Sequence, residues 1–146
     1  MVLSIFSPAD RPNSKEKAGE SETTKMPLVT VQYDSISLAG LANFLADGLP
    51  KVVAGALTCA HPDGSLTELD VEVEVSLMSS GMRTRYNVRV IVEANEYPER
   101  MTHLGKSKAA IAAAIKTRIT EYDPWADPRP KAWLWVRLCP GEWCEI

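Results

Sequence analysis

The stretch that decides the fold is Met26-Pro27-Leu28-Val29-Thr30-Val31-Gln32-Tyr33. Its β-branched residues predict a strand from about Leu28 to Tyr33, and a proline directly behind a methionine opens that strand. If the functional polypeptide begins at Pro27, this residue carries a free secondary amine, which is a base and a nucleophile. If the polypeptide begins at Met1, Pro27 is an ordinary amide without such chemistry. The sequence leaves both starts open.

The first 25 residues differ in composition from the rest of the chain. From Ser7 to Lys25 the segment is polar, and its basic residues balance its acidic ones. Such a segment buries too little apolar surface to offset the entropy of ordering, so we predict that residues 1–25 are disordered. They are either a leader or the result of a start assigned too far upstream. We favour the second interpretation, because Met26 stands where the predicted folded domain, residues 26–146, begins.

The composition of the whole chain indicates one soluble, cytoplasmic domain. With 146 residues, of which 45% are hydrophobic and 24% charged, the chain is able to build a packed core. A net charge of -3 argues against a nucleic-acid partner, which needs a basic face. No apolar run approaches the roughly 20 residues of a membrane helix, so we expect no membrane association. The apolar start of the chain is too short for a signal-peptide core.

Cysteine and histidine usage predicts neither a disulfide framework nor a metal centre. Cys59, Cys139 and Cys144 are odd in number, and the last two lack the spacing of a zinc site. The two histidines, His61 and His103, lie far apart, and we expect them to be exposed to solvent rather than catalytic. We therefore expect no metal and no cofactor.

Hydrophobic periodicity predicts the remaining helices and strands. Apolar residues at helical spacing predict a helix from the region of Ser35 to Thr58, which Pro50 kinks or divides into two abutting helices. A second helix is predicted over about 102–122, where a run of alanines favours close packing on a sheet. Alternating apolar residues predict strands at 69–77, 84–94 and 131–138.

The predicted order is β-α-β-β-α-β, which gives an α+β fold. Two β-α-β units form a four-stranded mixed sheet with two helices on one face. The open face then carries aromatic and charged side chains: Asp70, Glu72, Glu74, Arg89, Ile91, Trp133, Trp135 and Arg137. Such a mixture is typical of an interface, so we expect a homo-oligomer whose sheets face inward. In the alternative interpretation, the two tryptophans lie under the C-terminal tail around Trp143.

Residues 27–146 resemble the tautomerase superfamily, which includes macrophage migration inhibitory factor (MIF) and 5-carboxymethyl-2-hydroxymuconate isomerase. The most specific element is Met26-Pro27-Leu28-Val29-Thr30-Val31. The element order, Leu49-Pro50 in the first helix and the last strand Trp133-Leu134-Trp135-Val136-Arg137-Leu138 are also similar. The resemblance implies a homotrimer whose sheets face a central channel. It also implies a tautomerase or isomerase in which Pro27, freed by removal of Met26, is the catalytic base or acid.

The resemblance further implies small 2-oxo or 2-hydroxy acids as substrates, with arginines holding their carboxylates. Candidate substrate-binding residues come from the junction of strand three with helix two, from the residues ahead of strand three, and from the outward face of the last strand. In the family, that outward face lines the neighbouring copy's proline pocket. The candidates are Asn95, Tyr97, Arg100, Arg83, Arg85, Trp133, Trp135 and Arg137. For each arginine, a solvated or interface charge is the alternative interpretation.

Two alternatives to a catalyst remain open. A ferredoxin-like module that binds a ligand or partner has the same order of elements, but its first strand lies between the third and the fourth. A tautomerase fold without catalysis would act as a binding or structural protein. The strand order separates the first alternative from the predicted fold. Whether Pro27 is a free amine or an amide separates the second alternative from a catalyst.

Overall fold

The computed structural model describes residues 27–79 and 85–140. Predictions that concern residues 1–25, Arg83, Cys144 and the tail around Trp143 therefore lie outside the described residues. The elements in chain order are β2 (Leu28–Tyr33), the 3-10 turn η2 (Ile36–Leu38), α1 (Ala39–Leu57), the 3-10 turn η3 (Glu68–Asp70), β3 (Glu72–Leu77), β4 (Val88–Asn95), α2 (Pro98–Thr102), α3 (Leu104–Tyr122) and β5 (Ala132–Cys139).

The four strands form one mixed sheet in the order β3-β2-β4-β5. β2 and β3 pair in parallel, β2 and β4 pair antiparallel, and β4 and β5 pair in parallel. Each parallel pair is joined through a helix, α1 or α3, so the sheet contains the two predicted β-α-β units. The first strand lies between the second and the third. The ferredoxin-like alternative is therefore wrong, because it requires the first strand between the third and the fourth.

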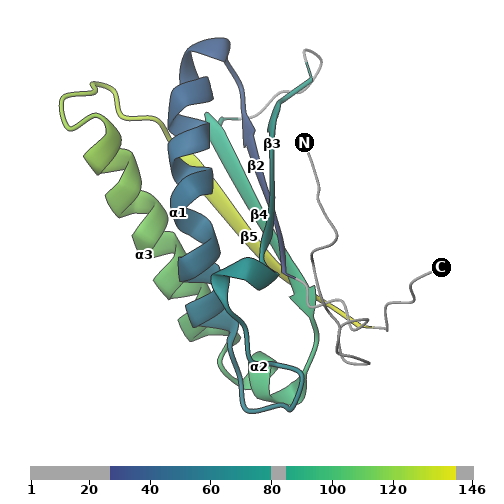
Figure 1. The fold of residues 1–146 in the computed structure, drawn as a ribbon. Helices are drawn as coiled ribbons and strands as arrows, with labels where there is room; N and C mark the ends of the chain where they lie inside the picture. Colours follow the sequence, from purple (N-terminus) through teal and green to yellow (C-terminus); the bar gives the residue numbers. More distant parts are fainter. Residues whose placement is uncertain (1–26, 80–84, 141–146) are drawn as a thin grey trace. The chain divides into compact units, whose positions relative to one another are not determined.

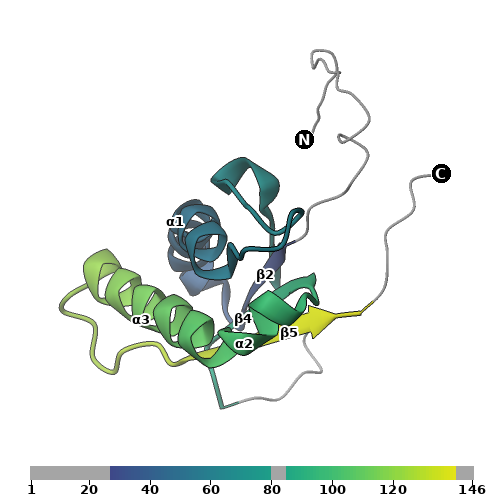
Figure 2. The same ribbon diagram turned by 90° about the horizontal axis from the view of Figure 1, so that it is seen from below.

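Both long helices cover the same face of the sheet, as Figures 1 and 2 show. Alternate residues of the two central strands point toward these helices and are fully buried: Val29, Val31, Val88, Val90 and Val92. They pack with Leu45, Leu49 and Val53 of α1 and with Ile111 and Ile115 of α3 in one apolar core. The alternation predicted for the third strand is confirmed, because a strand covered on one face buries every second side chain.

α1 is one continuous helix with Pro50 inside it, not two abutting helices. Together with η2 it spans Ile36–Leu57, 22 residues that are long and apolar enough to cross a membrane by length and composition alone. From the sequence, this segment did not stand out as a possible membrane helix, because polar and charged residues such as Asp47 and Lys51 interrupt its apolar residues. In this fold, the apolar stripe of α1 packs in the core under the sheet, where Leu45 and Leu49 are fully buried.

α1 and α3 are joined by an arginine that crosses between them. The Arg118 guanidinium lies 4.0 Å from the ring centroid of Phe44, and its Nη2 donates to the Phe44 carbonyl at 2.7 Å. A Cβ at Gly48 would lie 2.3 Å from this guanidinium. Glycine in the middle of α1 therefore makes room for the cation that connects the two helices.

Several boundaries differ from the sequence prediction, and the third strand begins at Val88 rather than at about residue 84. The second strand begins at Glu72, because Thr67 and Asp70 form a capping box that turns residues 68–70 into η3. Leu69 is therefore 92% exposed instead of buried, and Asp70 lies in the turn instead of on the open sheet face. The predicted second helix corresponds to α3, which begins at Leu104, and the residues just ahead of it form a separate short helix, α2.

Candidate functional site

Pro27 stands at the entrance of β2, a central strand of the sheet. Its side chain is less than 2% exposed, and its carbonyl accepts the Glu72 N–H at 3.1 Å. Side chains alternate between faces along a strand, so Pro27 lies on the same helix-covered face as Val29, while Leu28 lies on the open face. The sequence predicted Pro27 as the head of the first strand. The structure adds that its ring is buried at the edge of the core.

The strand directions bring several predicted site residues to the end of the sheet at which Pro27 lies. β2 and β3 begin here, whereas β4 and β5 end here. Across the open face, Leu28 pairs with Glu93, and Glu93 pairs with Arg137. Asn95, the last residue of β4, pairs with Cys139. Arg137 and Asn95 are therefore brought to the end of the sheet at which Pro27 lies.

Arg137 forms an ion pair with Glu93, which lies directly opposite on β4. The hydrogen bond to Glu93 raises the pKa of the Arg137 guanidinium. The side chain of Arg137 is 54% exposed, and its guanidinium lies 6.0 Å from the ring centroid of Trp135. Arg137 is therefore a fixed cation that still faces solvent. Sequence reasoning missed Glu93 as its partner, because the pairing depends on the register between β4 and β5.

Tyr97 and Asn95 form the junction between β4 and α2. The amide of Asn95 donates to the hydroxyl of Tyr97 at 3.4 Å. The ring of His61 stacks on Tyr97 with a centroid distance of 3.9 Å and an interplanar angle of 5°. His61 was expected to be exposed to solvent, but it is partly buried in this stack, and its Nδ1 accepts the N–H of Asp63 at 3.0 Å. The connection after α1 is thereby held against the junction.

Arg100 is 2% exposed and binds backbone carbonyls from three segments. Its Nε donates to Leu57 O at 2.9 Å, its Nη1 to Asn95 O at 2.8 Å, and its Nη2 to Gly64 O at 3.4 Å. Burial lowers the pKa of the Arg100 guanidinium, while the neighbouring Cys59 and Tyr97 oppose this shift. Each nitrogen of the guanidinium is engaged with a carbonyl. This geometry favours a structural role for Arg100 over the predicted binding of a substrate carboxylate.

Arg85 lies at the opposite end of the sheet from Pro27. It precedes β4, whose first residue, Val88, pairs with Tyr33 at the far end of β2. Its side chain is exposed. Within one chain, the structure therefore does not bring Arg85 and Pro27 together.

The open sheet face has the predicted mixture of aromatic and charged side chains. Trp133 and Trp135 on β5 contact each other edge to face, with centroids 5.6 Å apart, and Trp135 is 50% exposed. The Arg89 guanidinium donates to Gln32 Oε1 from Nε at 2.9 Å and from Nη2 at 2.6 Å.

In residues 27–79 and 85–140, no group of three or more His, Cys, Asp or Glu side chains is placed to hold a metal ion.

The fold of this chain is similar to that of a solved 5-carboxymethyl-2-hydroxymuconate isomerase, as the sequence predicted. A 5-carboxymethyl-2-hydroxymuconate isomerase from Deinococcus radiodurans R1 matches with a TM-score of 0.50 at 12% identity, over 85% of this chain and 92% of its own. MIF2 of Leishmania major has a TM-score of 0.47 at 14% identity and covers 84% and 94%. MIF of Giardia lamblia has a TM-score of 0.37 at 17% identity and covers 80% and 98%. No family model and no curated protein sequence matches the chain.

Proposed function

We propose that this chain is a small-molecule tautomerase or isomerase that uses the free amine of Pro27 as general base and acid on 2-oxo or 2-hydroxy acids. The observation that carries the proposal is the position of Pro27, which is buried at the entrance of a central strand in a tautomerase fold. The matching isomerase agrees with this class of reaction. The proposal requires that residues 1–26 are removed, because only then is Pro27 an amine.

The surroundings of Pro27 favour a neutral amine near neutral pH. A secondary ammonium is disfavoured relative to the amine where apolar burial removes water, so its pKa falls. Glu93, which pairs with the residue next to Pro27, would oppose this effect if its charge were free. Its ion pair with Arg137 compensates that charge. In the proposed reaction, the amine accepts a proton from the carbon beside a substrate carbonyl and returns it elsewhere.

Arg137 is the best-placed cation for the substrate carboxylate. It is exposed, it lies at the Pro27 end of the sheet, and Glu93 holds it in position. A guanidinium binds a carboxylate through two parallel hydrogen bonds and stabilises the negative charge that develops as the enol forms. Trp135, over which Arg137 lies, supplies an apolar surface beside the charge.

Replacing Arg137 with glutamine is expected to raise KM for an arylpyruvate about tenfold to hundredfold, the range expected for a lost charge-assisted hydrogen bond. The same change leaves Glu93 unpaired, which favours the ammonium form of Pro27 and shifts the acidic limb of the kcat/KM profile to higher pH. The double variant Arg137→Gln with Glu93→Gln should restore the pH profile but not KM. Lys131→Gln, at the other end of the strand, is the matched control. Unchanged KM in Arg137→Gln contradicts this role.

We also propose that the chain is a homo-oligomer, most consistent with a trimer, in which the open sheet faces turn inward. The supporting observation is the half-exposed Trp135 beside Trp133 and Arg137 on a face that no helix covers. In such an assembly, the outward residues of β5 face the Pro27 pocket of a neighbouring copy. Arg85, which is remote from Pro27 within one chain, can reach a site only from another copy.

Replacing Trp135 with glutamate should convert the oligomer to monomer, because a charge buried in an interface without a partner costs several kcal/mol. Analytical ultracentrifugation at micromolar concentration measures this directly. The matched control is Trp125→Glu, since Trp125 is 89% exposed and lies in the loop after α3. A monomeric parent protein, or a variant with the parent's mass, contradicts the proposed interface.

The experiment that tests the proposed function compares three chains in the enolisation of phenylpyruvate. The first begins at Pro27, the second comprises residues 1–146, and the third carries one alanine ahead of Pro27. Only the first has a free proline amine, so only the first should be active. Equal activity of all three chains contradicts catalysis by Pro27. A form in which Pro27 remains an amide fits the alternative function, a tautomerase fold that binds a ligand or partner without catalysis.

A further inference from the structure

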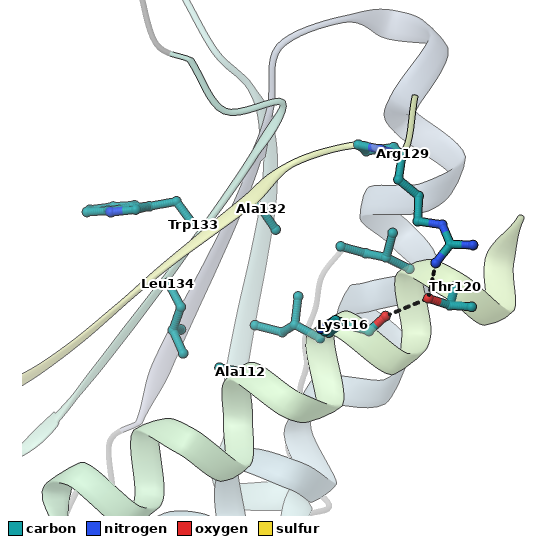
Figure 3. Close-up of a pocket in the computed structure, with 10 residues that line it drawn as sticks. Ala112, Lys116, Thr120, Arg129, Ala132, Trp133 and Leu134 are labelled. Carbon is teal, nitrogen blue, oxygen red and sulfur yellow. Dashed lines mark hydrogen bonds between the residues drawn. The ribbon is translucent and has the colours of Figure 1, made fainter. Parts of the chain in front are cut away.

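A cavity of about 350 Å³ lies between α3 and β5, on the helix-covered side of the sheet (Figure 3). Its walls are apolar, with Ile115 and Ile119 from the helix and Leu134 from the strand. Two small side chains, Ala112 on α3 and Ala132 on β5, leave the space between these walls open. The volume lies within the range of pockets that bind small organic ligands.

Two cations lie among the residues that line this cavity, Arg129 and Lys116. The Arg129 guanidinium donates to Thr120 Oγ1 at 3.1 Å and to the Pro124 carbonyl at 3.3 Å, as Figure 3 shows for the first contact. Thr120 in turn donates to the carbonyl of Lys116 at 3.2 Å. Arg129 is therefore held in place by neutral acceptors. In the part of the chain that the structure describes, neither Arg129 nor Lys116 forms an ion pair with a carboxylate.

The cavity is separate from the Pro27 end of the sheet. Leu134 pairs with Val90, and Val90 pairs with Val31, near the end of β2 that is far from Pro27. From Ala132 to Arg137 the strand advances about 17 Å, at roughly 3.3 Å per residue. A ligand in the cavity therefore does not contact the groups assigned to the proposed reaction.

We propose that this cavity is a second binding site, which takes a planar aromatic monocarboxylate. The aromatic body lies between the faces of α3 and β5, where the two alanines leave a narrow space between Ile115 and Leu134. The carboxylate lies at the rim and binds Arg129, with Lys116 as a second cation. The ligand needs one negative charge and an apolar body, because the cavity has cations only at its rim and branched aliphatic side chains inside. Ala132, Trp133 and Leu134 form the strand side of the cavity, and the indole of Trp133 points away from α3 (Figure 3).

The test is calorimetric titration of the full chain, residues 1–146, with 2-naphthoate as the probe. Saturable binding with one site per chain is the expected result. Arg129→Gln should weaken it about tenfold to hundredfold, the effect of removing a charge-assisted hydrogen bond. The neutral analogue 2-naphthalenemethanol should lose a similar factor against the parent chain. Lys108→Gln, a change of an exposed lysine on the same helix outside the cavity, should leave the affinity unchanged.

A second variant tests the apolar part of the site without changing charge. Ala132→Leu places additional atoms in the cavity and should abolish binding, and circular dichroism verifies that the variant is folded. The proposal is overturned if 2-naphthoate does not saturate the parent chain at millimolar concentration. It is also overturned if Arg129→Gln and Lys108→Gln bind equally well, or if folded Ala132→Leu binds as the parent does.

Discussion

In a chain that begins at Pro27, replacing Pro27 with alanine is expected to lower kcat/KM for the enolisation of phenylpyruvate about 10²- to 10⁴-fold. This range is the usual contribution of a positioned general acid or base. The alanine chain keeps a terminal amine, but that amine is primary, has a different pKa, and is not held by a ring packed at the edge of the core. Because Pro27 is less than 2% exposed, the substitution also opens space beside the reacting nitrogen.

The measurement is the rate of enol formation followed by ultraviolet absorbance over a range of pH. A matched control is Leu28→Ala, which removes apolar volume from the next residue and leaves the proline ring intact. It should retain most of the activity. Full activity in Pro27→Ala, with the pH profile of the parent chain, would reject the proline as the catalytic group.

The second large effect is expected on stability. Replacing Arg100 with methionine should lower the free energy of unfolding by about 2–4 kcal/mol, because the carbonyls of Leu57 and Asn95 lose the guanidinium donors and the Gly64 carbonyl keeps only the N–H of Cys59. Against a total stability of roughly 5–15 kcal/mol, this loss is large. Part of this loss of stability is offset, because the substitution also removes the cost of desolvating the buried guanidinium. The same burial lowers the pKa of Arg100.

Urea denaturation followed by circular dichroism measures this loss. Arg85→Met is the control, since Arg85 is exposed and its substitution should change stability by less than about 0.5 kcal/mol. Arg100→Lys should fall between the two, because an ammonium keeps the charge but does not span three carbonyls with a planar fork. An Arg100→Met chain as stable as the parent would show that these carbonyls find other donors.

The fold was predictable because its signals are local and repeated. Alternation over 88–92 identified a central strand whose valines are all buried, and the helical spacing of Leu41, Leu45 and Leu49 identified the stripe of α1 that packs in the core. The prediction failed at Leu69, where apolar alternation continued into a turn. The capping contacts of Thr67 and Asp70 outweigh the hydrophobic pattern there. The order of strands in the sheet did not follow from the order of elements along the chain, since the ferredoxin-like fold has the same order of elements.

The site was predictable only in part. Residue type was enough to nominate Pro27 and Arg137, and the register then placed both at one end of the sheet. The partner of Arg137 depends on which residue of β4 lies opposite, and no short-range pattern encodes that. His61 contacts Tyr97 across more than 30 residues of chain. Arg100 was a reasonable carboxylate-binding candidate by type and position, but burial and three carbonyl partners give it another role.

The proposed catalysis requires a free amine at Pro27, and the mass of the intact protein purified from its natural host tests this directly. The predicted result is a polypeptide that begins at Pro27, with residues 1–26 absent, and a first Edman cycle that yields proline. A mass that includes residues 1–26, with Pro27 joined to Met26 through an amide, would contradict the proposed role of Pro27.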